Sequence, residues 1–334
     1  MIFLYMAGIL PKDREESSVF PYYSYDGGGF LMKKKIIIDT DTGTDVDDAV
    51  AITLALKSPE LKVEGITTVY GNTLLRAQIV LKLLKLMGIN DVPVAAGVEK
   101  PLLRERDIWW PGHEGKGILT DEDKNLKPVD KHAVDFIIEK IMENPGEITL
   151  VTIGPLTNIA AAIIKEPKII ENVKEIVMMG GVARIFDNAP ELPYIEHNIK
   201  CDPEAARVVF NSQIPITMVG LDVTLKVPIN RSHLQKIKNV GTDLTDTLVR
   251  LIEIWWEFLK SDSSCMHDPL ALSYCIKPEF LETMNCKVIV ETQGKHTVGQ
   301  TIVIPDENSN IKVACGVDSD GFIEFLIGRI CSKN

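Results

Sequence analysis

The chain has 334 residues, of which 45% are hydrophobic and 25% are charged, as expected for a globular protein large enough to bury a full core. Its formal net charge of −11 argues against a general nucleic-acid-binding protein, because phosphate contacts require clustered Lys and Arg. No apolar stretch reaches the roughly 18 residues that a membrane helix requires, so we expect a protein that acts on small molecules, with neither nucleic acid nor membrane as partner.

The N-terminal segment lacks the apolar length and the cleavage pattern of a signal peptide. Met32 stands directly before three lysines and the first apolar run, so it would serve as a natural start. We therefore expect residues 1–33 to be a disordered or non-native extension, and residues 34–334 to form a single domain.

From residue 34 onward, short apolar runs alternate with helical patterns, which is typical of repeated βα units. Runs rich in β-branched residues predict strands at 34–39, 63–71, 148–154, 173–181 and 215–223. Apolar residues at helical spacing predict helices at 48–57, 75–87, 131–142, 156–164 and 203–210, with Pro203 and Pro269 each at the first position of a helix. The predicted fold class is α/β: an open, mostly parallel, Rossmann-like sheet flanked by helices.

Polar residues and glycines follow these predicted strands: Asp39 and Asp41, then Asn72, Gly154, Met179 with Gly180, and Asp222. In open α/β sheets, ligands bind beyond the carboxyl ends of the strands. The pattern therefore predicts one shared crevice with the active site at that edge, although turns also favour Gly, Asn and Asp.

Five aspartates lie within ten residues of the first predicted strand and its loop: Asp39, Asp41, Asp45, Asp47 and Asp48. Carboxylates this close raise one another's pKa unless a cation or strong hydrogen-bond donors lie among them. With no Cys or His nearby, an oxygen-binding ion such as Ca²⁺ or Mg²⁺ is favoured over zinc. Helix capping and turn formation remain a simpler alternative.

Seven strings in order along the chain resemble the inosine-uridine preferring nucleoside hydrolase family. They are DTDTGTDVDDA from residue 39, ITTVYGN from 66, VTIGPLTN from 151, VMMGG from 177, EHNIKCDPEAA from 196, GLDVT from 220 and HDPLA from 267. This resemblance implies calcium-dependent hydrolysis of the N-glycosidic bond of ribonucleosides to free base and ribose. It also implies a homodimer or a homotetramer, and leaves the base preference open.

The resemblance also implies roles for particular residues. Asp41, Asp48, Asp268 and the main-chain carbonyl of Ile153 would bind Ca²⁺, and Asp41 would also be the general base that activates a metal-bound water. Ribose contacts would come from Asp47, Asn72, Met179, Glu196 and Asn198. His267 would protonate the leaving base, with packing over the base as the alternative.

Other positions stay open. The loop between Gly43 and the paired aspartates is longer than the family pattern, which leaves the register of Asp45 against Asp47 uncertain, while Asp39 is expected to be a buried supporting residue. His113, in a glycine-rich loop, and His197 are further candidates for substrate contact. Of Trp255 and Trp256, one could stack on the nucleobase, but adjacent residues of a helix cannot share a face, so at least one should pack elsewhere.

Rival interpretations are weaker. IIIDTDTGT resembles the strand and DxDGT loop of haloacid-dehalogenase-type phosphatases, where Asp39 would be the nucleophile, but its glycine and threonine are displaced by one residue. An EF-hand loop fails, because its sixth and twelfth positions counted from Asp39 are Thr44 and Val50. A non-catalytic ribose- or calcium-binding protein of the same fold is the remaining alternative.

The cysteines are scattered without CxxC spacing, which predicts reduced thiols and a cytoplasmic location. They are Cys201, Cys265, Cys275, Cys286, Cys315 and Cys331.

Overall fold

A nine-stranded sheet crosses the computed structural model, which describes residues 23–25, 30–184 and 192–332. The strands lie in the order β12-β11-β13-β8-β7-β6-β3-β4-β5, and all are parallel except β11, which runs antiparallel to β12 and β13. Their bounds are β3 Lys34–Thr40, β4 Leu61–Thr68, β5 Val94–Ala96, β6 Thr149–Thr152, β7 Glu175–Met179, β8 Ile216–Val219, β11 Leu281–Val290, β12 Thr301–Pro305 and β13 Ile311–Val317.

The direction of the chain across the sheet reverses next to β3. From β3 the chain moves outward through β4 and β5, then returns to place β6 on the other side of β3, followed by β7 and β8. Loops leaving β3 and β6 therefore turn to opposite faces and leave a crevice between them, which is where ligands bind in such sheets.

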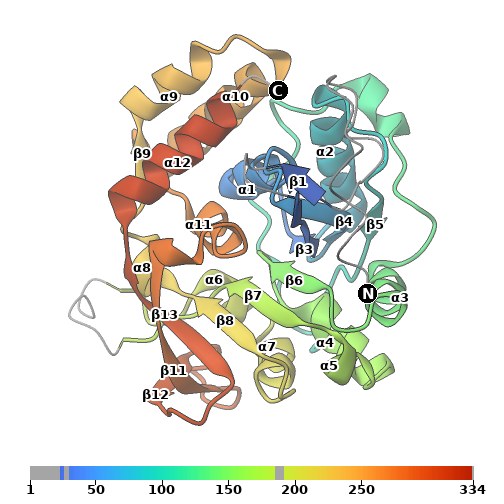
Figure 1. Cartoon of the computed structure of the whole chain (residues 1–334), viewed down its shortest axis with the longest axis vertical. Helices are drawn as coiled ribbons and strands as arrows, with labels where there is room; N and C mark the ends of the chain where they lie inside the picture. The colour runs from blue at the N-terminus through green and yellow to red at the C-terminus, as the bar shows by residue number, and fades with distance from the viewer. Residues whose placement is uncertain (1–22, 26–29, 185–191, 333–334) are drawn as a thin grey trace, which may run out of the picture.

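Alternating side chains of the strands pack against helices on both faces of the sheet. Ile36 and Ile38 belong to one buried cluster and Ile37 to the other, as the two-residue period of a strand requires. In Figure 1, α1, α2 and α9–α12 gather on one side of the sheet, and α3, α4, α5 and α7 on the other. Helix bounds are α1 Asp47–Leu56, α2 Thr73–Leu86, α3 Ala133–Glu143, α4 Thr157–Lys165, α5 Ile169–Asn172, α6 His197–Cys201, α7 Pro203–Phe210, α8 Leu221–Thr224, α9 Arg231–Lys238, α10 Asp243–Leu259, α11 His267–Ser273 and α12 Ser319–Cys331.

The α/β fold class and the mostly parallel sheet are confirmed, and a strand or helix lies within or across each predicted segment. Two details are wrong. The predicted strand 215–223 ends at Val219, and residues 221–224 form α8 instead. Pro203 opens α7 as predicted, but Pro269 is the third residue of α11, because that helix begins at His267.

Strands β5, β11, β12 and β13 and helices α9, α10 and α12 were not predicted. The short strands β9 Pro228–Asn230 and β10 Ser263–Cys265 form a separate antiparallel pair, and 3₁₀ turns lie at Asp121–Asn125 and Pro278–Phe280. At the N-terminus, where the sequence predicts a disordered or non-native extension, β1 Tyr23–Tyr25 pairs antiparallel with β2 Phe30–Met32. Residues 1–22 and 26–29, on which most of that expectation falls, lie outside the described residues.

All six cysteines are free thiols, as the sequence predicts. Within the described ranges, none of the helices has both the length and the apolar character needed to cross a membrane.

Candidate active site

A cavity of about 340 Å³ opens at the carboxyl ends of β3, β6 and β7. It contains most of the residues that the sequence singled out: Asp41, Asp45, Asp47, Asp48, Ile153, Met179, Glu196, His197, Asn198, Trp255, His267 and Asp268. Four others, Asp39, Asn72, His113 and Trp256, are not among its lining residues.

Three carboxylates meet at the floor of this cavity. Asp47 and Asp48 begin α1, Asp268 lies in the first turn of α11, and each offers an oxygen within 4.8 Å of the other two. The two helices pack against each other, and the main-chain amide of Asp268 donates a 3.0 Å hydrogen bond to Asp47 Oδ2. This cluster contains Asp47 where the sequence argument expected Asp41, because the start of α1 places both members of the DD pair opposite α11.

The repulsion among these buried carboxylates favours a bound cation. Burial raises the pKa of Asp48 and of Asp268 well above the usual carboxyl range, and the neighbouring aspartates raise both further. Thr40 donates a hydrogen bond to Asp48, which offsets a small part of this cost. A divalent ion that binds oxygen would relieve the repulsion, so the donor set fits Ca²⁺ or Mg²⁺.

Asp41 lies beside this cluster, on the loop that follows β3. Burial raises its pKa, while the positive charge of Arg76 acts in the opposite direction. Gly154, which follows β6, approaches it so closely that a Cβ there would lie 2.9 Å from both the main-chain nitrogen and Oδ1 of Asp41. The glycine in the VTIGPLTN string therefore allows the ends of β3 and β6 to meet.

Asp39 and Asp45, the other two of the five aspartates around the end of β3, have different environments. Asp39 is buried behind the cavity and accepts hydrogen bonds from Thr67 (2.6 Å) and Asn158 (2.8 Å), and burial raises its pKa to about 7. Its position agrees with a supporting role and removes it as a nucleophile facing the cavity. Asp45 lines the cavity, and its Oδ1 accepts a 2.6 Å hydrogen bond from the amide of Val46 just before α1.

A second group of polar side chains comes from the loop before α6. Glu196 caps that helix, and its carboxylate accepts hydrogen bonds from the amides of Gly181, Asn198 and Ile199. The Asn198 side-chain amide lies 3.3 Å from the carbonyl of Met179 and 3.5 Å from that of Ile153. These two contacts of Asn198 join the carbonyl of Ile153, an expected metal ligand, to that of Met179 at the ends of β6 and β7.

Two histidines, His197 and His267, line the cavity. His267 Nδ1 is 2.7 Å from the hydroxyl of Thr224, which fixes the ring and leaves Nε2 as the nitrogen that can exchange a proton with a ligand. His197 is more exposed. Its Nε2 lies 3.4 Å from Cys201 Sγ, and its ring packs edge-on against Trp109 with 5.0 Å between centroids.

Aromatic rings form one wall of the cavity. Trp255 lines it and stacks on Phe258 at 5.3 Å, whereas Trp256 is in the core and donates a hydrogen bond to Ser264. The two tryptophans therefore separate as the helical spacing predicted. His113 packs on Phe258 and contacts the Thr44 carbonyl at 2.6 Å, next to the cavity but not in its lining.

Asn72 is not brought to the cavity. It is exposed and caps α2, where its side chain accepts a 3.0 Å hydrogen bond from the amide of Leu75. Asp222, also expected at the crevice, instead accepts hydrogen bonds from the amides of Ala183 and Arg184. Asn72 therefore serves a local helix cap, the simpler alternative noted for this pattern, whereas Asp222 joins the end of β8 to the loop after β7.

Sequence reasoning missed Trp109, which lines the cavity, and Arg76, which is buried beside the loop of Asp41. Trp109 lines the cavity from the loop between β5 and α3, and the adjacent Trp110 and the nearby His113 were a signal for it. Arg76 is fully buried, and it occupies the apolar stripe of α2 together with Ile79, Val80 and Leu83. A cation at such a position is the signal that could have drawn attention to it.

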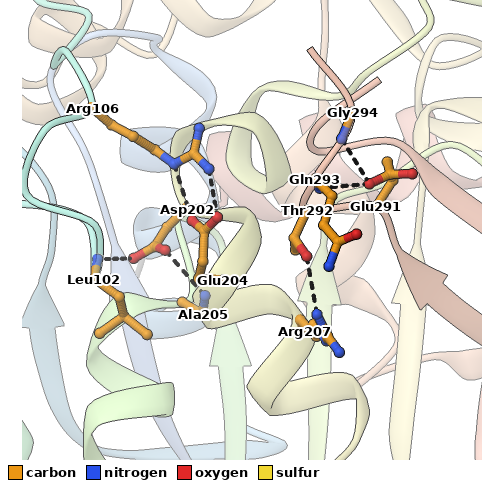
Figure 2. Close-up of polar contacts among 10 residues, drawn as sticks. All are labelled: Leu102, Arg106, Asp202, Glu204, Ala205, Arg207, Glu291, Thr292, Gln293 and Gly294. Atoms are coloured by element: carbon orange, nitrogen blue, oxygen red, sulfur yellow. Dashed lines mark hydrogen bonds and ion pairs between the residues drawn. The ribbon is translucent and has the colours of Figure 1, made fainter. Parts of the chain in front are cut away.

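The loop that carries Trp109 is anchored to the start of α7, as Figure 2 shows. Arg106 donates two hydrogen bonds to Glu204, at 2.5 and 3.0 Å, and the amide of Leu102 donates to Asp202 at 2.9 Å. Asp202 also accepts from Ala205 at 3.0 Å, so one carboxylate joins the loop to the helix cap. A separate contact of α7 in the same view links Arg207 to Thr292.

The chain is similar to known proteins over most of its length. The model of the inosine-uridine preferring nucleoside hydrolase family matches residues 36–324. The pyrimidine-specific ribonucleoside hydrolase RihA of Salmonella typhi is 35% identical over 312 residues, covering 90% of this chain and 99% of that protein.

Solved structures are also similar. The purine-preferring ribonucleoside hydrolase from Gardnerella vaginalis has a TM-score of 0.80 and 33% identity, covering 89% of this chain and 98% of its own. An inosine-guanosine nucleoside hydrolase has a TM-score of 0.77 and 29% identity, with 90% of this chain and 99% of its own covered. The chain therefore belongs to the inosine-uridine preferring nucleoside hydrolase family and is a nucleoside hydrolase.

Proposed function

We propose that this enzyme hydrolyses the N-glycosidic bond of ribonucleosides in a calcium-dependent reaction, with Asp41 as general base. The observation that supports this most is the meeting of Asp47, Asp48 and Asp268 at the floor of a cavity that has an aromatic wall. A buried cluster of acids suits a cation and sugar hydroxyls, and flat rings suit a nucleobase.

Asp48 and Asp268 are the ligands on which the sequence argument and the geometry agree, and Asp41 and the Ile153 carbonyl would complete the site. When bound, the cation supplies positive charge that lowers the pKa of a coordinated water and orients the ribose hydroxyls. The alternative, in which Asp47 rather than Asp41 is a ligand, follows from the cluster geometry. Calcium affinities of Asp41→Asn and Asp47→Asn, measured side by side, separate the two arrangements.

The residues account for each bond that changes. Asp41 takes a proton from the attacking water, whose oxygen bonds to C1′ of the ribose as the C1′–N bond breaks. The electron pair of that bond leaves with the base, and His267 gives the base a proton from its free ring nitrogen. Thr224 supports this role because it engages Nδ1 and fixes the direction of the ring.

Ribose contacts would come from Asp47, Met179, Glu196 and Asn198, all of which line the cavity. The carboxylate of Glu196 is fixed by main-chain amides, so a hydroxyl that donates to it would meet an oriented acceptor. No substrate contact is proposed for Asn72. Trp255 and Trp109 would flank the base.

The base preference needs measurement, because the relatives' names include both pyrimidine-specific and purine-preferring enzymes. We propose a steady-state panel of inosine, uridine, cytidine and adenosine, assayed for reducing sugar. Asp41→Asn should lose most of the activity, and 2′-deoxyuridine should be a poor substrate because its missing hydroxyl leaves buried acceptors unpaired.

The same assay tests the rivals. Equal turnover of uridine and 2′-deoxyuridine would contradict the ribose contacts, and an Asp41→Asn variant as active as wild type would contradict the mechanism. Calcium binding without release of any base would identify a binding protein. Hydrolysis of an aryl phosphate would favour the phosphatase, which the burial of Asp39 already disfavours.

We further propose that the enzyme is a homodimer or homotetramer, and that it acts in the cytoplasm, in purine and pyrimidine salvage. Light scattering coupled to size-exclusion chromatography tests the first of these. Fractionation of the source cells tests the second.

A further inference from the structure

Arg76 is a fully buried cation that no part of the proposed chemistry uses. Its guanidinium is satisfied by main-chain carbonyls and one hydroxyl. Nη1 donates to the carbonyl of Asp41 and, at 2.9 Å, to that of Thr42, while Nη2 donates to Thr44 Oγ1 at 3.3 Å. Removing a cation from water is unfavourable, so this many bonds from a buried guanidinium to one loop point to a specific task.

The same guanidinium also binds the loop after β4. Nε donates a 2.6 Å hydrogen bond to the carbonyl of Tyr70, a buried residue with φ of 66°. A tyrosine in this left-handed region is strained and persists only where its surroundings hold it. Arg76 therefore joins the end of β3, which carries Asp41, to a strained residue at the end of β4.

A third loop rests on this junction. The Trp110 ring packs on the Arg76 guanidinium, with 5.0 Å between Cζ and the ring centroid. Gly71 makes room for that ring, since a Cβ there would lie 2.5 Å from it. The neighbouring Trp109 donates its main-chain amide to the Tyr70 hydroxyl at 2.8 Å. The aromatic wall of the cavity is thus fixed to the same junction.

We propose that Arg76 is a positioning residue that holds Asp41 in register with the carboxylate cluster and, through Tyr70 and Trp110, sets the position of the Trp109 wall. The inference rests on the proposed function of the cavity. A guanidinium suits this task because its planar donors reach diverging acceptors at once, whereas a lysine ammonium on a flexible stem cannot reproduce that arrangement.

The test compares Arg76→Lys and Arg76→Gln with Arg329→Lys as a matched control. Arg329 donates two hydrogen bonds to Glu60, at 2.8 and 2.9 Å, and does not line the cavity. Each variant is assayed for thermal unfolding, for Ca²⁺ affinity by calorimetry after chelation, and for kcat and KM with the best ribonucleoside substrate.

We expect Arg76→Gln to bind Ca²⁺ at least about tenfold more weakly and to lose about 100-fold in kcat/KM, with partial recovery of both in Arg76→Lys. Arg329→Lys should lose thermal stability alone. If the Arg76 variants lose only stability, as the control does, the residue is merely structural and the proposal fails.

Tyr70→Phe removes a single hydroxyl, so it keeps the proposal testable if the Arg76 variants do not fold. It should raise KM while leaving Ca²⁺ affinity unchanged, because the Trp109 amide loses its acceptor while Arg76 keeps its bonds to the Asp41 loop and to the Tyr70 carbonyl. An unchanged KM would overturn the link to that wall. If no ribonucleoside is hydrolysed even by wild type, the proposed function fails, whereas the Ca²⁺ affinities still decide the role of Arg76.

Discussion

Replacing Gly154 by alanine tests how tightly the general base is held. A Cβ at this position would lie 2.9 Å from the nitrogen and from Oδ1 of Asp41, and 3.0 Å from Cγ1 of Val69. Two of these three atoms belong to Asp41, one of them in its backbone, so the contact cannot be relieved by turning a flexible side chain. The loop after β3 must move.

The expected magnitude follows from this contact. Ordinary contacts begin near 3.4 Å, so Asp41 must shift by roughly half an ångström, and the overpacking should cost about 1–3 kcal/mol in the free energy of unfolding. A misplacement approaching 1 Å at a catalytic group costs on the order of 100-fold in rate. We therefore expect kcat/KM to fall by between about 10- and 100-fold.

The assay is release of reducing sugar from the best ribonucleoside, with urea unfolding measured in parallel. Gly328→Ala is the matched control, because that glycine lies within α12 and a Cβ added there would meet nothing within 4 Å, so alanine should be neutral or stabilising. If Gly154→Ala keeps wild-type kcat/KM and stability, then Asp41 is not fixed by this contact and the reasoning is refuted.

Three further predictions concern the metal, the acid and the fold. Chelation of Ca²⁺ should lower the melting temperature, and calcium at 100 times its Kd should restore about 2.7 kcal/mol; an unchanged melting temperature would argue against a metal in the folded enzyme. Thr224→Val should lower kcat by roughly tenfold or more without weakening Ca²⁺ binding, because His267 loses its orienting partner, and equal kcat would show that this contact does not orient the acid. Asp123→Asn should cost about 1–2 kcal/mol at pH 7: burial alone would raise the pKa of Asp123, but hydrogen bonds from Lys82 and Thr120 outweigh it and lower the pKa to about 2. Since that stability is present above the unfolded pKa near 4 and is lost as the pH falls through 2, urea unfolding of both proteins should converge at the acid end.

Local sequence patterns were sufficient for the elements that lie in the middle of the sheet. Strands β3, β6 and β7 are buried on both faces, so their apolar runs are continuous and easily recognised. Strand β12 at the edge of the sheet and its neighbour β11 are half-exposed, and their pattern depends on which elements cover them. That dependence is why they were missed.

Position in the sequence was a weaker guide to the site. Asn72 and Asp222 follow strands as Asp41 does, yet each accepts hydrogen bonds from main-chain amides and neither is among the residues that line the cavity. Trp255 and Trp256 could be separated in principle by helical spacing, but only packing decides which of the two faces the cavity.

The sequence alone determined the α/β class, the succession of central strands and helices along the chain, and the family. It also determined a cluster of acids directly after the first strand. These features follow from residue types and local spacing. Tertiary structure decided which of these acids meet at the cavity and which are buried elsewhere. The packing of α1 on α11 brings Asp268 to Asp47 and Asp48. The pairing of β3 with β4 buries Asp39 against Thr67. Arg76 on α2 donates a hydrogen bond to the loop of Asp41. Each of these contacts joins residues from separate elements, so its energy depends on the folded arrangement and leaves no local pattern in the chain.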